Sequence, residues 1–175
     1  MNIQILIVII FAVNMLIIRL ATLNNKFGWF KPIAGIVFNF LPLVGVFFMQ
    51  PRFELDYFWW KVAGLIALSL GFIILGWAIN EFKKQTTSFR FDSNPEEFVN
   101  SGPFQFVRHP YYLGLIFVWI GWWWVWSAVY SFYLGMFIVA LTWLQAYVEE
   151  KLIMEKKFGE QYASYKTQTG MFWIK

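Results

Sequence analysis

The chain of 175 residues contains no cysteine, only one histidine and few charged residues. Without cysteine it can form no disulfide, thiolate nucleophile or cysteine metal site. A single histidine, with no HExxH-like pair, leaves little to bind zinc, so we expect no metal site. Charged residues make up 14% of the chain, against about 25% in soluble domains. This shortage of charge indicates that much of the chain does not face water.

Apolar residues make up the rest: 59% of the chain is hydrophobic and 23% is aromatic. A helix needs about 20 apolar residues to cross a hydrocarbon core of about 30 Å. Five apolar runs have about this length, at residues 3–20, 33–49, 57–79, 111–126 and 127–148. We therefore predict an all-α integral membrane protein with five transmembrane helices. The first run lacks a basic flank and a small-residue cleavage pattern, so we expect it to remain in the mature protein.

The last two runs are separated only by a short uncharged turn around Ser127. So short a connection joins antiparallel neighbours, which predicts a C-terminal helical hairpin. In the third run, Gly64 and Gly71 are typical of close helix packing. We divide the chain into a three-helix transmembrane scaffold, residues 1–80, and a core, residues 81–175, that contains the polar motifs.

Basic residues are distributed unevenly between the two sides of the predicted bundle. Twelve of the fourteen Lys and Arg residues lie in the first loop, the third loop and the tail, and only Arg52 and Lys61 fall on the other side. Because cytoplasmic loops collect basic residues, we predict that the N-terminus lies outside and that the third loop and C-terminus are cytoplasmic. Anionic headgroups account for the net charge of +4 without a nucleic-acid partner.

Two polar clusters flank the predicted hairpin. Arg108 and His109, the only histidine, precede its first helix, and Glu149 and Glu150 follow its second. Ionisable residues at such positions are candidates for a functional site, so we expect both clusters to line one cytoplasmic pocket. The alternatives without function are snorkelling of Arg108 to headgroups and pairing of the two glutamates with nearby lysines.

Residues 81–109 form too long a connection for neighbouring helices, and we interpret them as a lid or pocket wall. Within this stretch Ser101-Gly102-Pro103 predicts a turn. The tail is expected to begin as a helix that continues the last apolar run and to break at Gly159. Its aromatic residues suggest a segment along the membrane interface: Tyr162, Tyr165, Phe172 and Trp173.

The stretch Ser101-Gly102-Pro103-Phe104-Gln105-Phe106-Val107-Arg108-His109-Pro110-Tyr111-Tyr112-Leu113-Gly114 resembles the signature of the isoprenylcysteine carboxyl methyltransferase family. This broad family includes phospholipid and small-thiol methyltransferases. A second block, Glu149-Glu150-Lys151-Leu152 followed by Phe158-Gly159-Glu160-Gln161-Tyr162, is similar to the closing motif of the same family. The two blocks occur in the family's order and at a similar separation.

The resemblance implies an integral membrane methyltransferase that uses S-adenosylmethionine and lacks a Rossmann domain; no glycine-rich dinucleotide motif occurs in the sequence. It implies that the cofactor contacts are Glu96, Glu97, Phe98, Val99, Phe104, His109, Pro110, Tyr111, Tyr112 and Glu150. It implies that the residues of the reaction centre are Arg108, His109, Glu149 and Glu150. The expected acceptor is lipophilic or amphiphilic: a prenylcysteine-like carboxylate, a lipid amine or a thiol.

Two features of the chain depart from the prenylcysteine enzymes. Ala146 stands where those enzymes carry a substrate-contacting arginine, so a substrate carboxylate would lose its counter-ion. The tail after Gly170 also lacks the usual arginine and proline. One alternative is a sterol-type membrane reductase that uses NADPH, although Leu115 stands where those reductases commonly have an acidic residue. The other alternative is a non-catalytic membrane scaffold.

Overall fold

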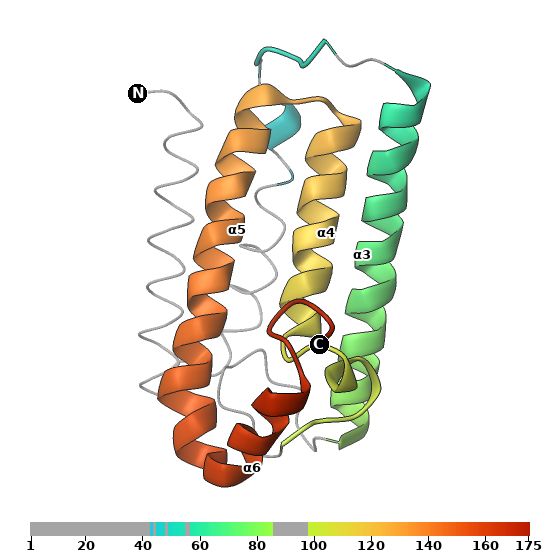
Figure 1. The fold of residues 1–175 in the computed structure, drawn as a ribbon. Helices are drawn as coiled ribbons and strands as arrows, with labels where there is room; N and C mark the ends of the chain where they lie inside the picture. Colours follow the sequence, from blue (N-terminus) through green and yellow to red (C-terminus); the bar gives the residue numbers. More distant parts are fainter. Residues whose placement is uncertain (1–42, 44, 48, 55–56, 86–97) are drawn as a thin grey trace. The chain divides into compact units, whose positions relative to one another are not determined.

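The computed structural model describes residues 43, 45–47, 49–54, 57–85 and 98–175 (Figure 1). Within these ranges the chain forms helices and isolated bridges but no strand, which confirms the all-α prediction for this part. The elements are η1 (Gly45–Phe47), α3 (Phe58–Gln85), η2 (Gly102–Gln105), α4 (Pro110–Val125), α5 (Val129–Glu149), the π-helical η3 (Glu150–Met154) and α6 (Glu155–Gln168). The first predicted apolar run, most of the second, and Glu96 and Glu97 lie outside the described residues.

Two of the described helices are long and apolar enough to cross a membrane, judged by length and composition: Phe58–Lys84 and Val129–Gln168. Helix α4 is also apolar but has only 16 residues. Large apolar side chains lie exposed along α3 and α5, as lipid contact requires: Leu65, Ile66, Phe72, Ile73, Met136, Phe137, Trp143 and Leu144. These observations support a membrane protein, while the number of spans stays a prediction.

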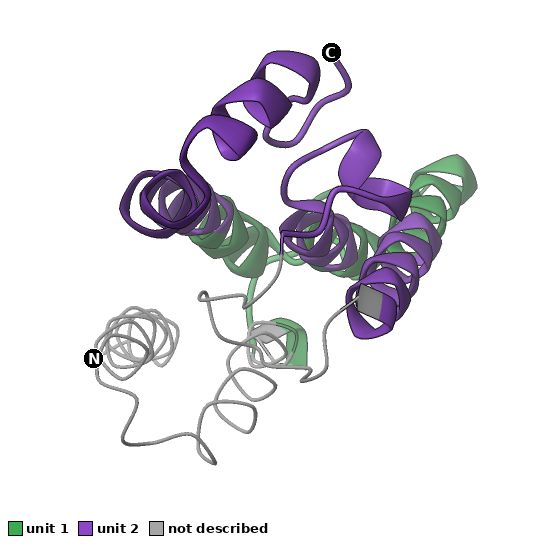
Figure 2. Cartoon of the chain, turned by 90° about the horizontal axis from the view of Figure 1, so that it is seen from below, with its two compact units in different colours: residues 1–68, 119–138 green, residues 69–118, 139–175 purple. Residues whose placement is uncertain are grey.

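The chain forms two compact units, each assembled from segments that are distant in the sequence (Figure 2). The first unit contains residues 1–68 and 119–138, and the second contains residues 69–118 and 139–175. Both predicted polar clusters belong to the second unit. The division at residue 80 separates the predicted scaffold from the core that contains the polar motifs, and not one compact unit from the other. It stays a prediction.

Glycines bring α3 and α4 into close contact within each unit. In the first unit, a Cβ atom on Gly64 would lie 3.1 Å from the carbonyl oxygen of Gly121. In the second unit, a Cβ atom on Gly71 would lie 2.6 Å from the backbone nitrogen of Val118 and 2.8 Å from the carbonyl oxygen of Gly114. Since these spaces admit no side chain, the predicted packing role of Gly64 and Gly71 is confirmed.

The connection between α4 and α5 is a tight turn in the first unit. Ser127 adopts a positive φ of 49° there, a conformation that lets the chain reverse within a few residues. Figure 1 shows α4 and α5 running in opposite directions on either side of this turn. The predicted helical hairpin is therefore confirmed.

The chain changes from apolar to charged residues where α5 ends. The charged residues begin at Glu149, and the next turn, Glu150–Met154, is a π-helix, a local widening that is frequent at functional sites. Within α6 the backbone of Gly159 leaves helical geometry, with φ of 48° and ψ of −122°. The predicted break at Gly159 is therefore confirmed.

Candidate active site

Local sequence places Arg108 and His109 at the start of α4. Gly102 has a positive φ of 56°, and a Cβ atom on it would lie 2.7 Å from Cγ of Glu81. Glycine therefore allows the predicted turn there, which leads into η2. Pro110 is the first residue of α4, a position that suits proline because its missing N–H needs no helical partner. The carbonyl of His109 accepts the backbone N–H of Leu113 at 3.0 Å, so His109 caps the helix.

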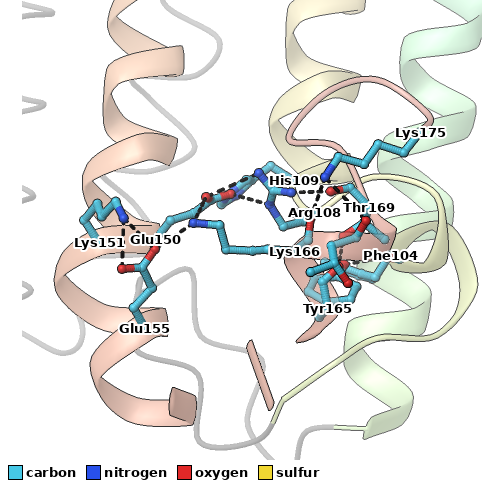
Figure 3. A network of polar contacts seen from close by, with 11 residues as sticks. Phe104, Arg108, His109, Glu150, Lys151, Glu155, Tyr165, Lys166, Thr169 and Lys175 are labelled. Atoms are coloured by element: carbon cyan, nitrogen blue, oxygen red, sulfur yellow. Dashed lines mark hydrogen bonds and ion pairs between the residues drawn. The ribbon is translucent and has the colours of Figure 1, made fainter. Parts of the chain in front are cut away.

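Glu150 joins the two predicted polar clusters (Figure 3). Nε of Arg108 donates to Oε1 of Glu150 at 2.7 Å, and Nη2 donates to Oε2 at 3.4 Å. Nε2 of His109 lies 3.1 Å from the same Oε1 atom. All three side chains are buried: Arg108 is 9% exposed, Glu150 is 3% exposed and His109 is 6% exposed. The structure thus brings together the residues before α4 and after α5.

The charge on Glu150 is stabilised by its partners. Burial raises the pKa of the Glu150 carboxyl, but hydrogen bonds from His109 and Arg108 and the attraction of both side chains outweigh burial and lower that pKa to about 2. The ammonium group of Lys166 lies near the same carboxylate, with Nζ 3.8 Å from Oε2, and it also donates to Glu155 at 2.7 Å. Glu150 is therefore a buried carboxylate at neutral pH.

Glu149 belongs to a second hydrogen-bonded group. Tyr112 donates its hydroxyl proton to Oε2 of Glu149 at 2.9 Å, and the amide of Gln145 donates to the same hydroxyl at 3.1 Å. The ring of Tyr112 stacks on His109, with centroids 5.6 Å apart and planes inclined by 23°. This stacking connects the Glu149 group to the Arg108, His109 and Glu150 group, so both glutamates are held in one polar cluster.

A group of aromatic rings packs together in the same unit. Phe98 lies 5.2 Å from Tyr165, 5.3 Å from Phe158 and 6.0 Å from Tyr162, measured between ring centroids. The hydroxyl of Tyr165 donates to the carbonyl of Phe104. Tyr162 and Tyr165 are only 2% and 9% exposed, and Phe98 packs against both rings. The position of this segment along the membrane interface stays a prediction.

The remaining predicted cofactor contacts occupy the same unit. Val99 and Pro110 are buried, and Tyr111 is half-buried in the first turn of α4. The predicted contacts Glu96 and Glu97 lie outside the described residues. Ala146, which takes the place of the arginine of the prenylcysteine enzymes, is completely buried. Among the described residues, no three His, Cys, Asp or Glu side chains gather as a metal site would require.

Sequence reasoning missed the contribution of the segment after α6. Nη1 of Arg108 donates to the carbonyl of Thr169. The backbone N–H groups of Arg108 and His109 donate to the carbonyls of Gly170 at 2.9 Å and Met171 at 3.2 Å. Every residue has a carbonyl, so no residue-type signal could have marked these partners. Their contribution becomes visible only in the folded chain.

Comparison with known proteins identifies the family to which this chain belongs. The family model described as phospholipid methyltransferase matches residues 59–161, which include both polar clusters and Gly159. None of the curated proteins compared with the chain matches it. The match covers more than half of the chain and agrees with the broad family that the two sequence motifs predicted. The chain therefore belongs to the phospholipid methyltransferase family.

Proposed function

We propose that this protein is a membrane methyltransferase that uses S-adenosylmethionine and methylates an amphiphilic acceptor. Family membership supports methyl transfer. The observation that supports the assignment of the active site is the buried contact of Glu150 with both Arg108 and His109. A buried ionised group is costly unless it is paired, and such groups gather at functional sites.

The chemistry of the described side chains fits the proposed cofactor. When bound, S-adenosylmethionine supplies a methyl group on a sulfonium cation. Two buried carboxylates, Glu149 and Glu150, lie in one cluster with the stacked rings of His109 and Tyr112. Carboxylates and aromatic faces both attract cations. Arg108 and Lys166 already balance the charge of Glu150, so we propose that Glu149 and the two stacked rings attract the positively charged ligand.

Arg108 acts as a positioning residue in this proposal. Its guanidinium donates to both oxygens of Glu150 and to the carbonyl of Thr169, which holds the carboxylate in one orientation. We assign Glu150 and His109 to contacts with the cofactor. Their fixed placement matters because orientation of reacting groups lowers the barrier by several kcal/mol, and a misplacement of about 1 Å costs about 100-fold in rate.

Glu149 is proposed to face the acceptor. It directly follows the apolar stretch of α5, and its hydrogen-bonding partner Tyr112 comes from the first turn of the apolar α4. An acceptor whose apolar part lies in the bilayer would bring its reacting group to this end of the helices. Phe98, Val99, Phe104, Pro110 and Tyr111 are proposed to line the cofactor site, and Glu96 and Glu97 remain predicted contacts.

Ala146 narrows the class of acceptor. At this buried position the chain offers a methyl group and not a guanidinium, while the neighbouring Gln145 is a neutral donor to Tyr112. A prenylcysteine carboxylate would lack its counter-ion, so a lipid amine or thiol fits better. We place the site and the C-terminus on the cytoplasmic side, as the distribution of basic residues predicts.

Calorimetric titration of S-adenosylhomocysteine into detergent-purified protein tests the proposal. We expect saturable binding that is lost in Glu150→Ala and kept in Glu160→Ala, because Glu160 is exposed on α6. A parallel titration with NADPH tests the reductase alternative. Binding of NADPH alone would replace the proposal with a reductase, and binding of neither cofactor by folded protein would favour a scaffold.

A further inference from the structure

The segment that follows α6 lies along the residues that precede α4. We call residues 169–172 the C-terminal strap. Gly170 of the strap forms a parallel bridge with Val107. From this bridge onward the strap carbonyls accept the backbone N–H groups of Arg108 and His109, at 2.9 Å and 3.2 Å. The strap therefore holds the main chain of both residues.

The strap also holds their side chains. The carbonyl of Thr169 accepts a hydrogen bond from Nη1 of Arg108, on the guanidinium that also contacts Glu150. The ring of Phe172 lies 6.0 Å from the imidazole of His109, between centroids. Arg108 and His109 are thus held through both main chain and side chain by consecutive residues of one segment.

The strap is buried and tightly packed. Thr169 and Met171 are 2% and 6% exposed, and the hydroxyl of Thr169 donates to the carbonyl of Tyr165 at 2.7 Å. A Cβ atom on Gly170 would lie 2.0 Å from the carbonyl oxygen of Trp173. Because this obstacle is backbone, a side chain at position 170 can be accommodated only if the strap moves.

We infer that the C-terminal strap is a positioning element of the active site, and that Gly170 is the residue that allows it to close on Arg108 and His109. The family match ends at residue 161, so the strap lies beyond the part of the chain that the family model covers. Its expected effect on cofactor affinity rests on the proposed function. The effect of the strap on the position of His109 does not rest on the proposed function, and it can be measured without any ligand.

The test uses Gly170→Ala with Gly76→Ala as matched control, because a Cβ atom on Gly76 meets nothing within 4 Å. His109 is the only histidine, so protein labelled with ¹⁵N-histidine and purified on a histidine-free tag gives the ring signals of this one residue. We expect Gly170→Ala to shift these signals and Gly76→Ala to leave them unchanged. Titration of S-adenosylhomocysteine should show affinity reduced about 10- to 100-fold in Gly170→Ala, because loss of a hydrogen bond to a charged group weakens binding by about this factor.

Unchanged ring signals and unchanged affinity in Gly170→Ala would overturn the inference. If the wild-type protein binds no S-adenosylhomocysteine, the proposed function fails, while the ring signals still decide the role of the strap. If Gly170→Ala does not fold, amide hydrogen exchange of the wild-type protein decides: strong protection of the Arg108 and His109 amides is expected. Exchange as fast as in an exposed loop would contradict the strap.

Discussion

Nε of Arg108 donates to Oε1 of Glu150 at 2.7 Å, although the two residues are 42 positions apart in the sequence. The same oxygen lies 3.1 Å from Nε2 of His109. One carboxylate oxygen therefore connects the residues that precede α4 with the turn that follows α5. A change in any of these three side chains should be felt by the other two, because they share one buried site.

Replacement of Arg108 by lysine should weaken cofactor binding. The guanidinium donates to Glu150 and to the carbonyl of Thr169 at once, and a lysine ammonium lacks this planar fork. We expect Arg108→Lys to bind S-adenosylhomocysteine about 10- to 100-fold more weakly, the size expected for a lost hydrogen bond to a charged group, as measured by calorimetry. Arg52→Lys is the control, since Arg52 contacts backbone carbonyls within the first unit. Equal affinities in the wild type and Arg108→Lys would contradict the positioning role.

The stability that Glu150 contributes should depend on pH in the acidic range. Its pKa is lowered from 4.5 to about 2 in the folded protein, so its contribution is fully present above 4.5 and is lost as pH falls towards 2. Comparison of melting temperatures for the wild type and Glu150→Gln between pH 3 and 7 isolates this group. We expect a difference that shrinks as pH falls below 4.5. A difference that stays constant down to pH 3 would show that the carboxyl is not stabilised as described.

Removal of the Tyr112 hydroxyl should separate binding from turnover. This hydroxyl donates to Glu149 and accepts from Gln145, whereas Glu150 keeps its own partners. We expect Tyr112→Phe to reduce kcat about 10- to 100-fold with little change in S-adenosylhomocysteine affinity. Tyr147→Phe, at an exposed position on α5, serves as control. Loss of affinity equal to the loss of kcat would place Glu149 with the cofactor and not with the acceptor.

A side chain at position 71 should destabilise the second unit. A Cβ atom there would lie 2.6 Å from the backbone of Val118, and such overpacking costs about 1–3 kcal/mol. Unfolding of Gly71→Ala in detergent should therefore occur at lower denaturant concentration than that of the wild type. Gly76→Ala should be neutral or stabilising, because alanine favours helix and the site is open. Equal stability of the two variants would contradict close packing of α3 on α4.

Local sequence determined the described helices of this protein and several of their ends. Long apolar runs predict helices because only a helix satisfies its own backbone hydrogen bonds in an apolar environment. The turn at Ser127 and the break at Gly159 lie where the sequence predicted them, and α4 begins at Pro110, a position that suits proline. The order of the two polar motifs also predicted the family, because it depends only on residue types and spacing.

Only the tertiary structure decided which partners those residues take. Lys151 is the sequence neighbour of Glu150, yet it pairs with Glu155 one helical turn away, and Glu150 pairs with Arg108. Tyr165 is buried against Phe98, which comes from a distant part of the sequence. The strap carbonyls carry no residue-type signal, because backbone groups are the same in every residue. Such contacts depend on how segments far apart in the chain meet, and residue preferences within a short window do not contain that information.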